Sequence, residues 1–380
     1  MTGIRLLADD LTGALDTAAE LVPIAGRVPV FWPEVLPAIL PSTCAIDSGT
    51  REKDRPDALV ATARLAPALA EAALSYKKVD SLLRGHTMGE LAACLRSGAW
   101  DRCIVAPAFP YQKRVTVGGV QKVLHSGGAV SVVGDLIALL ADAGVLAQRG
   151  VLDEPLRSGV SVFDAETDED LARVAALGRD APGAVLWCGS AGLAQALVGS
   201  RGIANPPPRL SGRVLGLFGS DHDVTTRQLQ SCGEAWIRLS GNGADLGRVS
   251  ALLENGDAVM ASLELPMGIS RAEAAGRIAA AFNGLVDGLR RPDTLLVAGG
   301  ETLRGLCAAL GTASLEVRGL FEPGLPHSLM RGGRWDGATV VSKSGAFGRP
   351  TLWRDLLSAS GHLETTTPEQ VRVRAEKVGA

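Results

Sequence analysis

Two adjacent carboxylates close the first apolar run of the sequence and are its most promising chemical groups. Asp9 and Asp10 directly follow residues 4–8 and precede a small-residue loop and an alanine-rich stretch. This pattern predicts a strand, a loop and a helix. Ligands of open α/β sheets bind beyond the carboxyl ends of the strands, so the pair could orient a hydroxyl, hold a metal or accept a proton. Alternatively, one carboxylate caps the helix and the other is solvated.

Three further strand ends in the first half of the chain carry polar side chains, within residues 47–51, 77–85 and 107–116. Their carboxylates could accept hydrogen bonds from polyol hydroxyls. Because Arg suits bidentate binding of carboxylates, the cations here are candidates for an acid group: Arg51, Lys78, Arg84 and Arg114. The alternative for each is an ordinary ion pair, and for Lys77 we adopt that alternative.

Three small-residue turns follow predicted strands in the second half of the chain, at 219–222, 299–302 and 343–348. Glycine lets backbone amides approach an anion, and a helix N-terminus presents unpaired N–H groups with a favourable dipole. Glycines at such turns also serve purely geometric purposes. Their recurrence in one region nevertheless favours a polyphosphate site.

Several familiar motifs are missing from the sequence. It contains no Gly-x-x-x-x-Gly-Lys-Ser/Thr and no Gly-x-Gly-x-x-Gly at the first predicted helix, which argues against a P-loop enzyme and a Rossmann dehydrogenase. Ser190 lacks the first glycine of a nucleophile elbow, which argues against an esterase.

Short apolar segments separated by helix-like stretches must position these groups. They cover 4–8, 44–46, 75–79, 103–106 and 184–187, and then 213–218, 258–263, 294–298 and 338–342. This alternation predicts mostly parallel sheets covered by helices. Consecutive prolines at 206–208 indicate a linker. We therefore predict an α/β fold with two α/β domains facing each other across a cleft, over residues 1–204 and 213–380, joined by a linker at 205–212.

Composition narrows the functional classes. A chain of 380 residues is long enough for two domains, and its formal net charge of -3 without a dense basic block argues against nucleic-acid binding. No apolar stretch reaches membrane-spanning length and the N-terminus lacks a basic and apolar leader, so we expect a cytoplasmic protein with no membrane partner. The six cysteines lack Cys-x-x-Cys spacing and are expected to be buried free thiols. Residues 364–380 are charged and predict a surface helix or tail.

Six motifs, in order, resemble the four-carbon acid sugar kinase family. They are Ala8-Asp9-Asp10-Leu11-Thr12-Gly13-Ala14, Lys78-Val79-Asp80-Ser81 with Arg84-Gly85, Pro107-Ala108-Phe109-Pro110, Gly189-Ser190-Ala191-Gly192-Leu193, Gly299-Gly300-Glu301-Thr302 and Lys343-Ser344-Gly345-x-Phe347-Gly348. The resemblance runs from Leu7 to about Trp353. Three departures concern the substrate: Leu15 where relatives carry Asn, Leu82 where they carry Thr, and Lys113-Arg114 where Gly-Arg is common.

The resemblance implies ATP-dependent phosphorylation of the terminal hydroxyl of threonate, erythronate or an oxo-tetronate. For the mechanism, we predict that Mg²⁺ bridges the phosphates and is partly held by Glu301. The resemblance also implies an acid-sugar-binding domain over residues 1–204 and a nucleotide-binding domain over residues 213–380. We predict that Asp10 or Asp9 is catalytic. The residues expected to bind the acid sugar are Thr12, Asp47, Arg51, Lys78, Asp80, Ser81 and Arg84, and the cation Arg114 is a further candidate. The residues expected to bind the nucleotide are Ser220, His222, Gly299, Gly300, Glu301, Thr302, Ser344, Gly345, Phe347 and Gly348.

Two alternatives stay open at this stage. One is a ribokinase-like small-molecule kinase, whose Gly-Ala-x-Asp pattern resembles residues 13–16 but lies late in the chain of that group. The other is a non-catalytic sugar-acid sensor, against which the intact Asp pair and the glycine turns argue. The sequence leaves the metal ligands, the sugar acid and the oligomeric state open, a homodimer included.

Overall fold

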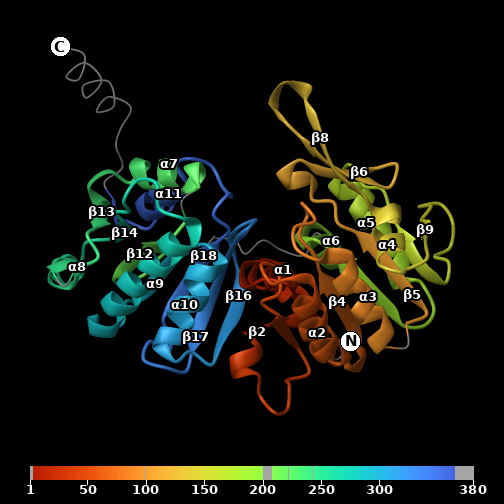
Figure 1. Cartoon of the computed structure of the whole chain (residues 1–380), viewed down its shortest axis with the longest axis horizontal. Helices are drawn as coiled ribbons and strands as arrows, with labels where there is room; N and C mark the ends of the chain where they lie inside the picture. The colour runs from red at the N-terminus through yellow and green to blue at the C-terminus, as the bar shows by residue number, and fades with distance from the viewer. Residues whose placement is uncertain (1–2, 99, 200–207, 221, 243, 364–380) are drawn as a thin grey trace. The chain divides into compact units, whose positions relative to one another are not determined.

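The computed structural model describes residues 3–98, 100–199, 208–220, 222–242 and 244–363, and the chain divides into two compact units (Figure 1). Unit 1 contains residues 1–205 and 312–336, and unit 2 contains residues 206–311 and 337–380. Each unit is an α/β structure with a mostly parallel sheet, as predicted. Part of the predicted linker, 205–207, and the predicted tail, 364–380, lie outside the described residues.

The main sheet of unit 1 is parallel except at one end. Its strands, in spatial order, are β17 (Leu325–Arg331), β16 (Ser314–Glu322), β2 (Val28–Phe31), β3 (Cys44–Asp47), β1 (Ile4–Ala8), β4 (Leu74–Lys78), β11 (Val185–Gly189), β5 (Arg102–Ala106), β10 (Gly159–Val162) and β9 (Ala147–Arg149). Strand β16 pairs antiparallel with β17 and with β2. The remaining neighbours pair in parallel.

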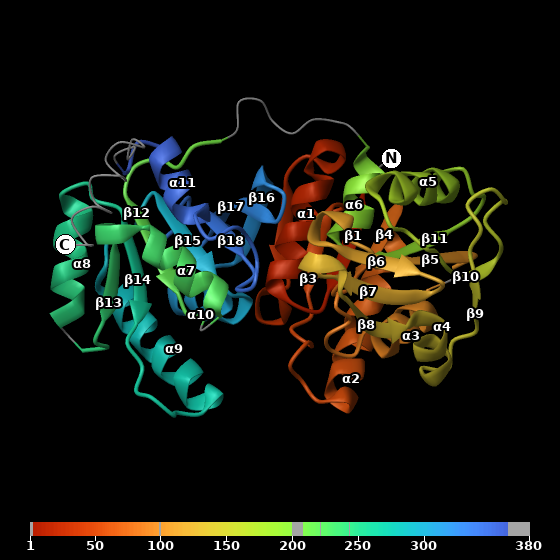
Figure 2. The same ribbon diagram turned by 90° about the horizontal axis from the view of Figure 1, so that it is seen from above.

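Helices cover both faces of this sheet (Figure 2). One face carries α1 (Leu11–Ala25), α5 (Asp168–Arg179) and α6 (Ala191–Val198), and the other carries α2 (Arg55–Leu65), α3 (Thr87–Ser97) and α4 (Leu136–Asp142). Helix α1 ends at Gly26, whose φ of 72° suits glycine. Helix α5 begins with a capping box between Thr167 and Asp170.

A small antiparallel sheet rises from unit 1 (Figure 1). It consists of β6 (Arg114–Val117), β7 (Val120–Leu124) and β8 (Val130–Asp135), in that order. The local sequence pattern does not predict this sheet. Its last strand is largely exposed, so it lacks the alternation of buried and exposed residues from which strands are read.

The predicted second domain, residues 213–380, is interrupted in the structure. Residues 312–336 belong to unit 1, because β16 pairs with β2 in a register that places Leu315 opposite Val30 and Val317 opposite Val28. Leu315 and Val317 are buried, and α1 packs against both strands of the hairpin. Burial of this apolar edge fixes the hairpin, a long-range pairing that the local sequence pattern does not reveal.

Unit 2 contains a fully parallel sheet. Its strands, in spatial order, are β13 (Trp236–Leu239), β14 (Val259–Leu263), β12 (Val214–Phe218), β15 (Thr294–Ala298) and β18 (Thr339–Lys343). The helices are α7 (Asp223–Ser231), α8 (Ala244–Glu254), α9 (Arg271–Gly288), α10 (Gly300–Leu310) and α11 (Leu352–Ala359). Helix α9 packs beside α10, and α7 beside α11.

Apolar side chains between sheet and helices form the core of each unit. In unit 1 the core includes Leu7, Ile46, Val105 and Leu186. All six cysteines are buried, and none of them forms a disulfide among the described residues, in agreement with the predicted thiols. None of the helices in the described part of the chain has the length and apolar character needed to cross a membrane.

Candidate functional site

The predicted acid-sugar residues gather where the strand order of unit 1 reverses. After β1 the chain continues to β2 and β3 on one side of that strand, and after β4 it continues to β5 on the opposite side. Ala8 of β1 pairs with Asp47 of β3, and Gly189 of β11 pairs with Lys78 of β4. The carboxyl ends of these four strands therefore lie along the same edge of the sheet. Such a switch point opens a crevice beyond the strands, the usual ligand position of open α/β sheets.

Arg51 joins the two predicted catalytic carboxylates. Its Nε and Nη2 donate to Oδ2 and Oδ1 of Asp9 at 2.8 and 2.7 Å, and its Nη1 lies 2.6 Å from Oδ2 of Asp10. Burial alone would raise the pKa of Asp9, but the charges of Arg51 and Lys78 outweigh it and lower that pKa. Asp9 is therefore an ionised carboxylate fully engaged by Arg51.

Asp10 is the N-cap of α1. Its Oδ1 accepts from the backbone N–H of Gly13 at 3.0 Å, and its Oδ2 accepts from the Thr12 hydroxyl at 2.6 Å. Asp10 therefore caps the helix, as one part of the alternative interpretation proposed. The other part, a carboxylate that is simply solvated, fits neither Asp9 nor Asp10. The Asp10 side chain remains 19% exposed, compared with 5% for Asp9. It is the more accessible carboxylate of the pair.

Lys78 reaches the same place from the end of β4. Its Nζ lies 3.8 Å from Oδ1 of Asp10, and its side chain is 8% exposed. A Cβ at Gly13 would collide with Nζ of Lys78, so only glycine leaves the space that this ammonium occupies. Gly13 therefore has a steric function that the sequence analysis did not assign.

Asp80 and Arg84 form a two-bond ion pair on the next loop. Nε and Nη2 of Arg84 donate to Oδ2 and Oδ1 of Asp80 at 2.9 and 2.8 Å. Burial of Asp80 opposes ionisation, but these bonds and the charges of Lys78 and Arg51 keep its pKa well below the usual range. Between them Leu83 has a φ of 54°, unusual for a residue with a side chain. The loop is thus held in a strained form around Asp80.

Arg114 enters the site from β6 and donates through Nη1 to the Ser81 hydroxyl at 2.5 Å. Asp47, which is buried, accepts from the N–H of Gly49 at 2.7 Å and so stabilises the loop leading to Arg51. The structure therefore brings the predicted acid-sugar residues of unit 1 together, some as direct contacts and others as loop supports.

A buried network beneath these loops was not predicted as part of the site. Lys77 and Glu90, each 1% exposed, form an ion pair of 2.7 Å, and the Thr50 hydroxyl donates to Glu90 at 2.6 Å. The ion-pair interpretation of Lys77 is therefore correct, although the pair is buried instead of lying at the surface. It ties α3 to the loop that carries Arg51.

Asp16 and Glu20 are two further carboxylates that the sequence analysis left out. They lie one turn apart on α1, and one oxygen of each, Oδ1 and Oε1, is buried without a hydrogen-bond partner among the described residues. Burial raises the pKa of Asp16 to about 6, while the charges of Lys78 and Arg114 lower it and that of Asp10 raises it. Burial, with repulsion from Asp16 and Asp168, raises the pKa of Glu20 to about 8. The i, i+4 spacing of two acids in a buried apolar helix was the available sequence signal.

The three small-residue turns of unit 2 converge in the structure. They follow β12, β15 and β18, and the strand order reverses between β12 and β15. A Cβ at Gly219 would collide with the Thr302 hydroxyl, and a Cβ at Gly345 would collide with the Ser220 hydroxyl. The turns therefore pack so closely that glycine is required at their contacts.

Two helix N-termini open at these turns. His222 caps α7 by accepting from the N–H of Val224 through Nδ1 at 3.2 Å. Gly299, with a φ of 105°, precedes α10 in a conformation that favours glycine. Dipoles and unpaired N–H groups at such ends suit phosphate oxygens. The residues present therefore fit a nucleotide polyphosphate.

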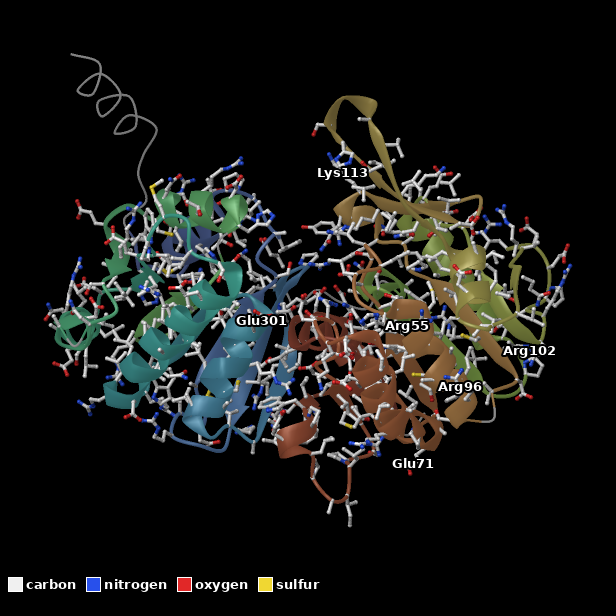
Figure 3. The ribbon with its side chains drawn as sticks, in the orientation of Figure 1. Arg55, Glu71, Arg96, Arg102, Lys113 and Glu301 are labelled. Atoms are coloured by element: carbon white, nitrogen blue, oxygen red, sulfur yellow. The ribbon has the colours of Figure 1, made fainter. Side chains whose placement is uncertain are left out.

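A metal ion would depend largely on the phosphates for its ligands. The described residues contain no group of three or more His, Cys, Asp or Glu side chains suited to metal binding. Mg²⁺ at phosphates commonly takes only one or two protein carboxylates. Glu301 is exposed in the first turn of α10 (Figure 3), so one carboxylate of this chain fits that requirement.

Solved structures with similar folds support the description of the whole chain. A protein of Salmonella typhimurium LT2 aligns with a TM-score of 0.71 and 20% identity, covering 93% of this chain and 98% of that one. A Haemophilus influenzae protein aligns with a TM-score of 0.69 and 18% identity, covering 94% and 100%. At these identities the likeness concerns the fold alone.

Sequence relatives identify the family. A family described as a sugar-binding N-terminal domain matches residues 4–137, and one described as a nucleotide-binding C-terminal domain matches residues 246–352. The D-threonate kinase of Cupriavidus necator is 30% identical, covering 92% of this chain and 96% of that protein. That of Salmonella typhimurium is 24% identical, covering 93% and 97%. This chain therefore belongs to the four-carbon acid sugar kinase family and is a sugar-acid kinase.

Proposed function

We propose that the enzyme transfers the γ-phosphoryl group of ATP to the terminal hydroxyl of a four-carbon acid sugar such as threonate, erythronate or 3-oxo-tetronate. The observation that carries this proposal is the set of carboxylates and cations held at the switch point of unit 1. It combines acceptors for hydroxyls with cations for an acid group, and relatives with this chain's domain order are D-threonate kinases.

Two cations of the cluster are suited to the substrate carboxylate. Arg51 and Arg84 are each committed to a two-bond pair with an aspartate. Arg114 instead donates to the neutral Ser81 hydroxyl, and Lys78 lies 3.8 Å from its carboxylate neighbour. Lys78 and Arg114 therefore retain the capacity to bind an added carboxylate.

Asp10 is the acceptor of the hydroxyl proton in this proposal, and Asp9 supports it by orienting Arg51. The proton moves to the Asp10 carboxylate while the hydroxyl oxygen bonds to the γ-phosphorus. The bond from that phosphorus to the β,γ-bridging oxygen breaks, and ADP leaves. Arg51 and Lys78 hold the Asp10 side chain in position. Mg²⁺, when bound, would neutralise phosphate charge, with Glu301 as its protein ligand.

In unit 2 the nucleotide is bound by the three converging turns. The N-termini of α7 and α10 offer N–H groups to phosphate oxygens, and Ser220, Thr302 and Ser344 add hydroxyls. ATP as the donor is compatible with the cytoplasmic location expected from the sequence.

ATP consumption across a panel of four-carbon sugar acids tests the proposal. We expect turnover with at least one acid, and at least a hundredfold loss of kcat in Asp10→Asn with nucleotide binding retained. Asp142→Asn, an exposed aspartate on α4, is the matched control and should be unchanged. Saturable binding of an acid without turnover by the wild type would favour a sensor. Near-normal turnover in both Asp9→Asn and Asp10→Asn would refute the role of the pair.

A further inference from the structure

Lys343, the last residue of β18, is a buried lysine at the start of the 343–348 turn. It is 1% exposed, and its Nζ donates to the carbonyls of Ser344 and Gly345 at 3.0 and 3.1 Å. It forms no ion pair with a carboxylate of the described residues, and it is the only lysine in the described part of unit 2. A buried charge without a counter-ion is costly, so its presence needs an explanation.

The same turn is held by two donors from α7. The Thr225 hydroxyl donates to the carbonyl of Gly345 at 2.9 Å, and Nε2 of Gln228 donates to the carbonyls of Phe347 and Arg349 at 3.0 Å each. Together with Lys343, these side chains bind four carbonyls of the segment 344–349. Each of these carbonyls is therefore fixed by a protein donor.

Fixing the carbonyls also orients the N–H groups. In a trans peptide the N–H of the following residue points opposite to the carbonyl. The N–H groups of Gly345, Ala346 and Gly348 must therefore point away from the donors, and they find no acceptor among the described residues. Successive N–H groups pointing the same way form an anion-binding concavity.

The charges around Lys343 also favour an anion at the N–H side of the 343–348 turn. Burial lowers the pKa of Lys343 to about 7. The groups that contact it, the carbonyls of the turn, and those that hold the turn, Thr225 and Gln228, are uncharged. Among the described residues of the neighbouring turns, the titratable side chains are His222 and Glu301, and both are exposed. An anion on the N–H side would supply the missing counter-charge and favour the protonated amine.

We propose that Lys343 is a positioning residue for the nucleotide phosphates, which holds the turn from behind and takes up a proton when phosphate charge arrives at the turn. This inference rests on the proposed function and deepens it. The protonated amine polarises the turn carbonyls, and through the peptide units it strengthens the opposite N–H groups as donors. Nucleotide binding and protonation of Lys343 therefore favour each other.

Calorimetric titration of the full-length protein with ADP at pH 8, in buffers of different ionisation enthalpy, tests this coupling. The wild type should take up most of one proton per ADP, because the unliganded amine is largely neutral at this pH. Lys343→Met keeps the aliphatic stem and should show no uptake and about tenfold weaker binding. Thr225→Val removes one support without removing charge, so it should weaken binding and retain the uptake.

Three results would overturn the inference. They are no proton uptake by a wild type that binds ADP, equal uptake by wild type and Lys343→Met, and uptake that disappears in His222→Gln while persisting in Lys343→Met. Lys122→Met, on β7 of unit 1, is the matched control and should behave as the wild type. If Lys343→Met does not fold, proton uptake by the wild type on binding ADP still tests the inference, because a wild type that binds ADP without uptake overturns it. A wild type that binds neither ADP nor ATP would instead refute the proposed use of ATP.

Discussion

Arg51 and Asp9, 42 residues apart in the sequence, meet through two parallel hydrogen bonds of 2.8 and 2.7 Å at the ends of adjacent strands β3 and β1. The backbone strengthens this contact, because the carbonyl of Asp9 accepts from the N–H groups of Thr50 and Arg51 at 2.9 and 3.1 Å. The pair therefore joins the two loops and at the same time places a third guanidinium nitrogen on Asp10. Its geometry sets the position of the proposed proton acceptor.

Arg51→Gln should destabilise unit 1 as well as abolish turnover. Removing the guanidinium leaves the carboxylate of Asp9 buried and unpaired, which costs about 3–5 kcal/mol in the free energy of unfolding. Denaturant unfolding followed by circular dichroism measures the loss. Arg96→Gln, at an exposed arginine of α3 (Figure 3), is the control and should change the stability by about 0.5 kcal/mol or less. Equal stability of both variants would show that the Arg51 pair contributes little.

Asp16→Asn should raise KM for the sugar acid about tenfold and leave kcat nearly unchanged. The reason is that Oδ1 of Asp16, which has no hydrogen-bond partner among the described residues, would accept a hydrogen bond from a substrate hydroxyl. In the wild type kcat/KM should fall below about pH 6, where this carboxyl becomes protonated. The variant should lose that dependence. Steady-state kinetics from pH 5 to 8 measure both effects. A large loss of kcat in Asp16→Asn would instead assign the proton acceptor to this residue.

Glu20→Gln should make the protein more stable at alkaline pH. The pKa of Glu20 is about 8 in the folded protein, against an ordinary value of 4.5, so the folded state keeps a proton that the unfolded state loses between these values. The contribution of Glu20 to stability is therefore complete below pH 4.5 and is lost as the pH rises to 8. Thermal unfolding should give a higher Tm for the variant at pH 8 and similar values at pH 5. Glu169→Gln, at an exposed position of α5, should show no such difference.

Gly13→Ala should impair acid-sugar binding through Lys78. The added Cβ would occupy the position of the Lys78 ammonium, so that side chain must move or the start of α1 must shift. Overpacking of this kind costs about 1–3 kcal/mol, and KM for the acid should rise. Gly276→Ala in α9 meets no atom within 4 Å and should stabilise its helix by up to about 1 kcal/mol. The free energy of unfolding and KM for the acid are measured for both variants. Equal effects of Gly13→Ala and Gly276→Ala on these two quantities would contradict the steric argument.

Local sequence patterns were sufficient to predict most of the parallel sheets. Every apolar segment that the pattern marked as a strand, from 4–8 to 338–342, forms one in the structure within a residue or two. Buried parallel strands are continuous apolar runs, so they are conspicuous without any knowledge of their partners. The strands that were missed, such as β16 and β8, depend on pairing with distant segments or are exposed, and neither property is visible locally.

The sequence by itself determined which residues stand at the strand ends, because an apolar run followed by Asp, Lys or Gly already marks the carboxyl edge of a sheet. Only the tertiary structure decided how these residues divide their tasks. It made Asp10 a helix cap, committed Asp9 to Arg51 and buried Lys343 behind a glycine turn. It also left Oδ1 of Asp16 without a hydrogen-bond partner in the part of the chain that the structure describes. Ionisation and hydrogen bonding depend on distances between groups far apart in the chain, and those distances exist only once the sheets have formed.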